Sequence, residues 1–254
     1  MRFDQLDARM RAFEAAADRQ VQPDMHIVVR LDGRGFTRLT KERHDFERPF
    51  DVRFHDMMVE TVRHLMQCGF RCLYGYSQSD EISLLLHRDE DAFARSEPKL
   101  LSLLAAEASA RFSLLLGDMA VFDARLSLLP GVSQVVDYFR WRQEDAARNT
   151  RNAHCYWLCR AQGLSPALTA ARLASMALEA KHELLFAHGI NFNELPDWQK
   201  RGWAFYWHDE PHGGVDPRSG ESRQGSRRRL RVEKRLPRGE DYGRLLATIA
   251  ADGG

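Results

Sequence analysis

The side chains most suited to chemistry stand in two acidic clusters that lie far apart in the sequence. Asp32 ends the apolar run MHIVVRLD and is followed by the glycine-rich stretch GRG. Asp80 and Glu81 stand where the polar segment SQSD gives way to the apolar run EISLLLH. A carboxylate at the edge of a buried sheet is costly unless a cation meets it. Mg²⁺ is suited to such a place, because it is usually held by one or two carboxylates together with substrate phosphates.

The chemistry that this pattern indicates is phosphoryl transfer. Two Mg²⁺ ions would activate an attacking oxygen and stabilise a leaving one, and the protein would add positioning and neutralisation of charge. The glycines of DGRGF allow the backbone to approach a phosphate, and Arg30 and Arg34 add positive charge beside Asp32. Taken alone, each aspartate is also typical of a turn residue or a helix cap. The phosphoryl-transfer interpretation therefore depends on whether the two clusters meet.

The pattern of apolar residues in the first half of the chain predicts an arrangement in which they do meet. The expected order is strand, helix, strand, strand, helix, strand, which is the ferredoxin-like β-α-β-β-α-β unit. In that unit the first and third strands are antiparallel neighbours at the centre of the sheet, so Asp32 lies beside Asp80 and Glu81. The predicted elements are strands 25–32, 70–76, 81–87 and 119–129, and helices 51–68 and 98–116.

Beyond residue 130 the sequence is mostly helical. A long amphipathic helix is expected from Ser133 to about Arg160, interrupted near Asn149, and Ser165-Pro166 begins another helix. Residues 203–208 predict a strand, and the alternating arginines of 227–235 predict its returning partner. The expected fold class is α+β, with a catalytic domain at 1–130 and a helical region at 131–254 that carries a small basic β-ribbon and packs on it.

Composition indicates a soluble globular protein, with 44% hydrophobic residues, 29% charged residues and a formal net charge of +1. The sequence shows no apolar stretch long enough to span a bilayer, so a cytoplasmic protein without a membrane partner is expected. The cysteines form two C-x3-C pairs, Cys68/Cys72 and Cys155/Cys159. A zinc site is one interpretation of them, and buried free cysteines are the favoured one.

Several motifs together resemble one known family. RLDGRGF, FERPFD, YGYSQSDEISLLL, FDARL, WRQEDAARN and GINFNELPDWQKRG occur in the order found in the tRNA-His guanylyltransferase family. The resemblance covers about residues 4 to 240. Members of this family resemble polymerases in their palm domain but add nucleotides in the 3′-to-5′ direction. The resemblance therefore implies a polymerase-palm-like catalytic domain.

The resemblance also implies the roles of individual residues. Asp32 and Asp80 are expected to hold two Mg²⁺ ions with the Gly33 carbonyl, and Glu81 is expected to support this catalytic set. ATP and GTP or other nucleoside triphosphates are the implied substrates. This chain has Thr37 where many relatives have histidine, and Arg48 where they have lysine. The implied nucleotide-binding residues are Asp32, Gly33, Arg34, Gly35, Phe36, Thr37, Arg48, Ser79 and Asp80.

One departure from the family pattern bears on the reaction. Residues 147–153 read ARNTRNA where the eukaryotic-type enzymes carry HINNLYN. The chain is in this respect similar to the Thg1-like branch of bacteria and archaea, which favours template-dependent repair of 5′-truncated tRNA over non-templated guanosine addition to tRNA-His. The implied mechanism has two stages. A 5′-monophosphate attacks the α-phosphate of ATP and releases pyrophosphate, and the 3′-hydroxyl of an incoming nucleotide then attacks the activated phosphate and expels AMP.

Two basic stretches are candidates for RNA binding, since phosphate contacts supply most non-specific affinity. Residues 223–235 hold seven basic residues against one acid, although a solvated strand face is the alternative. The second stretch lies on the long predicted helix. The predicted RNA contacts are Arg227, Arg228, Arg229 and Arg231 in the first stretch, and Arg140, Arg142, Arg148, Asn149, Arg151 and Asn152 in the second.

Two other functions stay open at this point. A nucleotidyl cyclase uses the same palm topology and carboxylate positions, but it has no need of the long C-terminal half. A non-catalytic RNA-binding module that retains the fold is the other alternative, and intact Asp32 and Asp80 argue against it. The resemblance further implies tRNA as a partner and a homotetramer built as a dimer of dimers, in which one tRNA crosses subunits.

Overall fold

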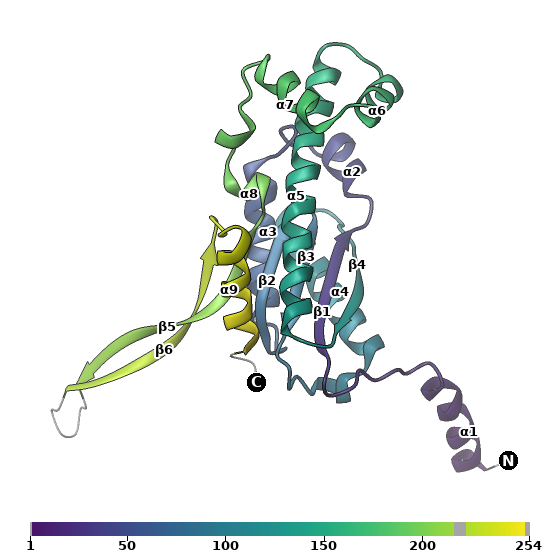
Figure 1. Cartoon of the computed structure of the whole chain (residues 1–254). Helices are drawn as coiled ribbons and strands as arrows, with labels where there is room; N and C mark the ends of the chain where they lie inside the picture. Colours follow the sequence, from purple (N-terminus) through teal and green to yellow (C-terminus); the bar gives the residue numbers. More distant parts are fainter. Residues whose placement is uncertain (1, 216–221, 252–254) are drawn as a thin grey trace.

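Six antiparallel strands form a single twisted sheet with helices on both faces (Figure 1). The computed structural model describes residues 2–215 and 222–251. The strands lie in the order β4-β1-β3-β2-β5-β6. Their bounds are β1 His26–Gly33, β2 Cys72–Gln78, β3 Glu81–Leu86, β4 Phe122–Leu129, β5 Trp203–Val215 and β6 Ser222–Glu233.

The predicted β-α-β-β-α-β unit is present, with helices α3 (Val52–Leu65) and α4 (Glu97–Leu116) between its strands. Strand β1 lies between β4 and β3 and is antiparallel to both. The register pairs Asp32 with Glu81, so the end of β1 lies beside the start of β3. The convergence of the two acidic clusters is therefore confirmed.

Helices α3 and α4 cover one face of the sheet. Ile27, Val29 and Leu31 of β1 point to this face because successive side chains of a strand alternate. Helix α3 begins at Asp51, whose carboxylate accepts a hydrogen bond from the Arg53 N–H over 2.7 Å. Helix α4 ends at Gly117, which adopts φ 73° and closes the helix in the left-handed region.

Helices α5 (Val132–Ala161) and α9 (Gly239–Ala251) cover the opposite face. Along β1 the residues on this face change from apolar Val28 through Arg30 to Asp32. Along β3 they change from Glu81 to Leu85, the register partners of Asp32 and Val28. The α5 face of the sheet is thus a hydrophobic core at one end and polar at the other, where the functional side chains gather.

The predicted interruption of the long helix near Asn149 is wrong. Helix α5 runs without a break over 30 residues. The stretch 132–161 contains no proline or glycine, so nothing in it breaks the backbone ladder. Thr150, next to the expected break, is buried and donates to the Gln199 carbonyl, which holds the helix in place there.

The C-terminal strands are longer than predicted. Strand β5 pairs with β2 and β6 pairs with β5, so the basic ribbon continues the palm sheet and its hairpin extends beyond it (Figure 1).

Helices α1 (Phe3–Ala15) and α9 are elements that the sequence patterns above did not predict. The remaining elements are α2 (Phe36–Arg38), a short π-helix at Leu39–Arg43, 3₁₀ helices at Ala92–Arg95 and Phe192–Glu194, α6 (Pro166–Ala174), α7 (Leu178–Phe186) and α8 (Asp197–Lys200).

The two cysteine pairs lie in different parts of the protein. Cys68 and Cys72 pack with the core between the sheet and α3, whereas Cys155 and Cys159 pack with α6 and α7. All four are free thiols. Over the described ranges, no helix combines the length and the apolar character needed to cross a membrane.

Candidate active site

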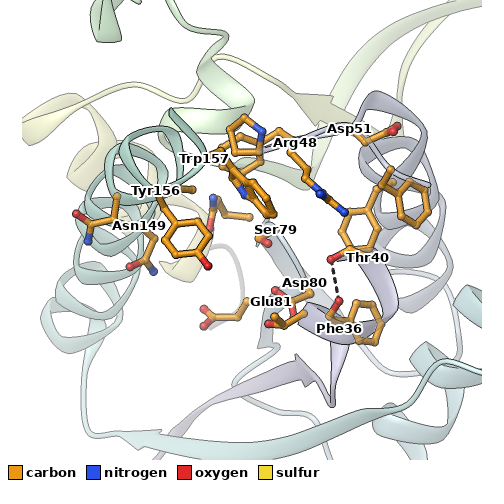
Figure 2. A pocket seen from close by; sticks show the side chains of 18 of the residues that line it. Phe36, Thr40, Arg48, Asp51, Ser79, Asp80, Glu81, Asn149, Tyr156 and Trp157 are labelled. Carbon is orange, nitrogen blue, oxygen red and sulfur yellow. Dashed lines mark hydrogen bonds between the residues drawn. The ribbon is translucent and has the colours of Figure 1, made fainter. Parts of the chain in front are cut away.

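A cavity of about 720 Å³ opens where the polar end of the sheet meets α5. Its floor is formed by Asp32 and by the turn from Gln78 to Glu81. One wall is the segment from Phe36 to His55, and the other is α5 from Arg142 to Trp157 (Figure 2). Side chains of α6, α7 and α8 close the cavity at the end away from the sheet. Its size lies within the range of small-molecule binding pockets.

The carboxylates of Asp32 and Asp80 both line this cavity. The Gly33 N–H donates to the Asp80 carbonyl over 3.2 Å, which fixes the turn before β3 against the end of β1. Burial raises the pKa of the Asp80 carboxyl to about 6, and the negative charge of Asp32 adds to the rise. Two neighbouring carboxylates, both half-buried, form a site that a divalent cation would stabilise.

Glu81 faces α5, and its charge is met there. Arg142 donates to both carboxylate oxygens of Glu81, with Nε to Oε1 at 2.7 Å and Nη2 to Oε2 at 2.8 Å. Arg30 Nη1 lies 3.9 Å from Oε2 of the same carboxylate. Burial raises the pKa of Glu81, while the two guanidinium groups oppose the rise. Both oxygens of Glu81 are thus engaged, which fits the supporting role predicted for it.

The DGRGF segment turns sharply from β1 into α2. A Cβ added to Gly33 would lie 2.5 Å from the ring of Phe36, so this position has no room for a side chain. Gly35 adopts φ 74°, which favours glycine. Phe36 lines the cavity, but it also packs in an aromatic cluster with Phe54, Phe112 and Phe122.

Above this segment the two walls meet in a group of cations and aromatic rings, with Lys41 and Arg48 from one wall and Trp157 from α5 (Figure 2). The Arg48 guanidinium lies 4.5 Å from the centre of the Trp157 ring, and Lys41 Nζ lies 5.2 Å from the same ring. Such cation–π contacts hold positive charge without neutralising it. Arg48 also donates to the Lys41 carbonyl over 2.8 Å. The wall therefore presents positive charge to the same cavity that has carboxylates on its floor.

Ten of the predicted site residues line the cavity: Asp32, Phe36, Thr37, Arg48, Ser79, Asp80, Glu81, Arg142, Asn149 and Asn152. Gly33, Arg34 and Gly35 belong to its edge loop but are not in its lining. Ser79 adopts φ 54°, a strained conformation for a residue with a side chain, in the turn that presents Asp80.

The predicted RNA contacts fall into two separate regions. On α5, Arg140, Arg148 and Asn149 are exposed, Arg151 is half-buried over the ring of Phe192, and the Asn152 side chain accepts a hydrogen bond from Lys181. Arg227, Arg228, Arg229 and Arg231 are exposed on β6, in the hairpin that leads away from the cavity (Figure 1). Arg223 begins the basic stretch but was not among the predicted contacts, and its side chain lies outside the described residues.

Arg142 occupies a different environment from the one expected of an RNA contact. Its side chain is only 8% exposed and is bound to Glu81 and Asp145. The sequence prediction grouped it with its exposed neighbours on the same helix, and the burial of α5 against the sheet separates them. This geometry assigns Arg142 to the support of Glu81.

Several cavity residues were not predicted from the sequence. Tyr156 and Trp157 lie between Cys155 and Cys159, a pair predicted to be a metal site or buried thiols. Lys41 and Lys181 carried no local signal, and Asp51 was predicted only as the start of a helix within the motif FERPFD. Asp123 of β4 is the register partner of Asp32 on the other side of β1 and is exposed. The motif FDARL, which contains Asp123, was the one available signal for its position.

Comparison with known families agrees with this geometry. Residues 7–130 match the family model described as tRNAHis guanylyltransferase, and residues 133–239 match the model of the Thg1 C terminal domain. The chain belongs to this family. It is therefore a nucleotidyltransferase with the palm-like fold of the family, as the resemblance of its motifs implied.

Curated relatives share about a third of the aligned residues. The tRNA(His) guanylyltransferase of Schizosaccharomyces pombe is 32% identical over 199 residues, which cover 74% of this chain and 75% of the relative. The probable tRNA(His) guanylyltransferase of Mus musculus is 30% identical over 210 residues, covering 77% of this chain and 70% of the relative.

Solved structures show that the fold extends over almost the whole chain. A bacterial tRNA(His) guanylyltransferase (Thg1)-like protein in complex with GTP superposes with a TM-score of 0.74 at 26% identity, covering 97% of this chain and 99% of the other. The Saccharomyces cerevisiae tRNA(His) guanylyltransferase gives a TM-score of 0.69 at 26% identity, covering 77% of this chain and 90% of the other.

Proposed function

We propose that this protein is a 3′-to-5′ RNA nucleotidyltransferase that repairs tRNAs truncated at their 5′ ends. The observation that carries the proposal is the meeting of Asp32 and Asp80 on the floor of a cavity whose wall is cationic. Family membership gives the reaction class, and a bacterial relative has been solved with GTP and, separately, with ATP. Nucleoside triphosphates are accordingly the substrates that we assign to the cavity.

The donor set of the site fits Mg²⁺. Asp32, Asp80 and the Gly33 carbonyl would supply hard oxygen ligands. Desolvation raises the pKa of Asp80 because it disfavours the charged carboxylate, and a bound cation would offset that cost. Over residues 2–215 and 222–251, no cluster of three or more histidine, cysteine, aspartate or glutamate side chains has the spacing of a metal site. Two carboxylates suffice because substrate phosphates complete a Mg²⁺ shell. The bound ions would supply charge neutralisation during phosphoryl transfer.

The side chains of the cavity have separate roles in this proposal. The edge loop from Gly33 to Thr37, together with Ser79, would contact the triphosphate, and Arg48 would neutralise its charge from the wall formed by residues 36–55. Arg142 would keep Glu81 on the α5 side, away from the ligands. In the first stage the 5′-monophosphate of the RNA attacks the α-phosphate of ATP and pyrophosphate leaves. In the second stage the 3′-hydroxyl of a nucleotide attacks the activated 5′ phosphate and AMP leaves.

Two observations favour templated repair over non-templated guanosine addition. The segment ARNTRNA lacks the histidine of the eukaryotic-type enzymes, and its residues Asn149 and Asn152 line the cavity. The departure from the family motif therefore lies in the site itself. The exposed arginines of α5 and β6 would bind the tRNA backbone. We also propose that residues 1–130 form the catalytic domain, that 131–254 serve RNA binding, and that the protein works as a homotetramer in the cytoplasm.

The test is a single-nucleotide extension assay. The protein is incubated with Mg²⁺, ATP, all four nucleotides and a 5′-monophosphorylated tRNA that lacks its first nucleotide. We expect extension by the nucleotide complementary to the opposing base, and a change of added nucleotide when that base is changed. Asp80→Asn should reduce the rate by about a thousandfold, the loss expected when a main electrostatic stabiliser of the transition state is removed.

Matched substrates separate the alternatives. Guanosine added to full-length tRNA-His regardless of the opposing base would favour non-templated addition. Cyclic nucleotide formed from ATP or GTP without RNA would favour a cyclase. RNA binding with neither product, and no difference between the wild type and Asp80→Asn, would favour the non-catalytic module and contradict the proposal.

A further inference from the structure

Helix α1 is an unpartnered element with one apolar face. None of its residues is buried, and it projects from the body of the protein on the side away from the β5–β6 hairpin (Figure 1). Its four large apolar side chains, Phe3, Leu6, Met10 and Phe13, are 77%, 41%, 51% and 66% exposed. Their spacing of three, four and three residues is that of the a and d positions of a coiled coil.

The helix is held away from the body by a well-anchored connection. The Val21 N–H donates to the Arg95 carbonyl over 3.0 Å, and Ser96 donates to the Asp18 carboxylate over 2.5 Å. Arg95, which is buried, donates in turn to the carbonyls of Val21, Gln22 and Met25. The root of α1 is therefore fixed, although no residue of the helix is buried. A 13-residue helix is marginal in water by itself, so an apolar face of this size indicates a partner.

The charges beside the apolar face indicate which partner fits. With Phe3 and Met10 at a and Leu6 and Phe13 at d, Arg9 occupies a g position, and Arg2, the extended N-cap residue, precedes the helix at the equivalent place. Asp7 and Glu14 occupy e positions, and Asp7 accepts a hydrogen bond from Arg11 of its own helix over 2.8 Å. In a parallel pair of helices each g residue meets the e residue five positions further along the other helix. Arg2 then meets Asp7 of the second copy, and Arg9 meets Glu14.

The antiparallel arrangement lacks this complementarity. It brings g positions against g positions and e positions against e positions, so arginine would meet arginine and carboxylate would meet carboxylate. Like charges in direct opposition destabilise such a seam. A two-fold axis parallel to the helices generates such a parallel pair from two identical copies.

We propose that α1 is a docking helix that pairs in parallel, and in register, with α1 of a second copy of this chain. The contact joins two protomers through Phe3, Leu6, Met10 and Phe13, and the Arg2–Asp7 and Arg9–Glu14 pairs flank it. This helix–helix contact does not depend on the proposed reaction, because α1 contributes no residue to the cavity and lies away from the basic hairpin (Figure 1). It adds a specific interface to the proposed tetramer.

A lipid surface is a poorer match to this helix. Helices that lie on membranes are rich in lysine and arginine on their polar face. Residues 2–15 instead hold three arginines, Arg2, Arg9 and Arg11, and three acids, Asp4, Asp7 and Glu14. This stretch is therefore neutral overall, which favours self-pairing.

Disulfide trapping of the full-length protein tests the proposal. Leu6→Cys places the same residue from two copies at a d position of a parallel seam, so mild oxidation should give a covalent dimer. Ala8→Cys is the matched control, because its f position faces away from the seam. The wild type controls for its own thiols, of which Cys72, Cys155 and Cys159 are buried.

A charge series tests the orientation. Arg9→Glu places like charges across the seam and should lower the yield of the Leu6→Cys dimer several-fold. The double change Arg9→Glu with Glu14→Arg should restore it. Asp4→Arg, with a charge change of the same size at an exposed outward b position, should have little effect.

Each other outcome overturns the proposal. No Leu6→Cys dimer, or equal trapping of Ala8→Cys, would exclude a parallel seam. Trapping only between Leu6→Cys and Met10→Cys would show an antiparallel pair. Binding of the wild type to phosphatidylserine vesicles, lost in Leu6→Ser/Phe13→Ser and not accompanied by trapping, would assign α1 to a membrane surface.

Discussion

Arg142 of α5 and Glu81 at the start of β3 form a bidentate ion pair of 2.7 and 2.8 Å, in which both side chains are largely buried. The pair joins the floor of the cavity to its α5 wall. Asp145 accepts a further hydrogen bond from the same guanidinium over 2.9 Å and also pairs with Arg148. Charged groups thus connect the catalytic strand end to the helix, in addition to the apolar packing of α5 on the rest of this sheet face.

Removing Arg142 should destabilise the protein strongly. Arg142→Met leaves Glu81 buried with Arg30 as its remaining cation, and we expect the free energy of unfolding to fall by about 3 kcal/mol. Arg142→Lys should recover part of this loss, because an ammonium cannot reproduce the bidentate geometry. Urea unfolding measures both. Arg148→Met is the control, since this residue is 67% exposed. Equal effects of Arg142→Met and Arg148→Met would contradict the role assigned to the buried pair.

Asp80 should reduce stability while serving function. Asp80→Asn removes a half-buried negative charge beside another carboxylate. Without Mg²⁺ we therefore expect the free energy of unfolding at neutral pH to rise by about 1–3 kcal/mol. Mg²⁺ should raise the melting temperature of the wild type but not of Asp80→Asn. Differential scanning calorimetry with and without Mg²⁺ measures this, and exposed Asp137→Asn is the control. A variant less stable than the wild type in the absence of Mg²⁺ would refute the prediction.

His55 should make the protein sensitive to acid. Its ring is buried and stacks on Trp198 at 4.3 Å, and burial lowers its pKa to about 4. In the unfolded chain the pKa is about 6.5, so below that pH the unfolded chain binds a proton that the folded protein does not. The stability contributed by neutral His55 is complete above about pH 6.5 and is lost as the pH falls to about 4.

The measurement for His55 compares the wild type with His55→Phe, which keeps an aromatic ring and cannot titrate. From about pH 7.5 to about pH 4.5 the wild type should lose up to about 3 kcal/mol more unfolding free energy than the variant. The difference between the two proteins cancels the contribution of other titrating groups. Parallel stability curves for the two proteins across this range would show that His55 does not cause the loss.

Gly33 and Gly35 should respond differently to a methyl group. Gly33→Ala forces the new Cβ against the Phe36 ring, so the edge loop must shift, and we expect a loss of about 1–3 kcal/mol together with weaker nucleotide binding. At Gly35 the added Cβ meets nothing within 4 Å, and its left-handed backbone costs about 1 kcal/mol. Urea unfolding and ATP titration check both. Unchanged ATP affinity in Gly33→Ala would show that Phe36 does not position the loop.

The arginines of β6 should control the salt dependence of RNA affinity. Replacing Arg227, Arg228 and Arg229 by glutamine should reduce the slope of log K against log salt by about 1 for each lost phosphate contact. Filter binding of tRNA over a salt series gives the slope. The same replacement of Arg125, which is exposed on β4, is the control. An unchanged slope would place the RNA elsewhere.

The sequence by itself determined the palm unit and the meeting of Asp32 with Asp80 and Glu81. Strand alternation, glycine stops and helix caps are local signals, and the β-α-β-β-α-β order leaves one arrangement that joins those strand ends. Helix α9 was not predicted, because its position depends on contacts with residues far away in the sequence. This helix packs on the α5 face of the sheet, where the hydroxyl groups of Tyr242 and of Tyr74 on β2 lie 3.0 Å apart.

Only the tertiary structure decided which side chains of α5 are exposed to solvent or to the cavity and which are buried. Arg142 and Arg148 carry the same charge on the same helix, yet one is 8% and the other 67% exposed. Tyr156 and Trp157 face the cavity, while Cys155 and Cys159 of the same turns are buried against α6 and α7. Periodicity gives the faces of a helix but not what packs on each, because burial is set by contacts between segments far apart in the chain.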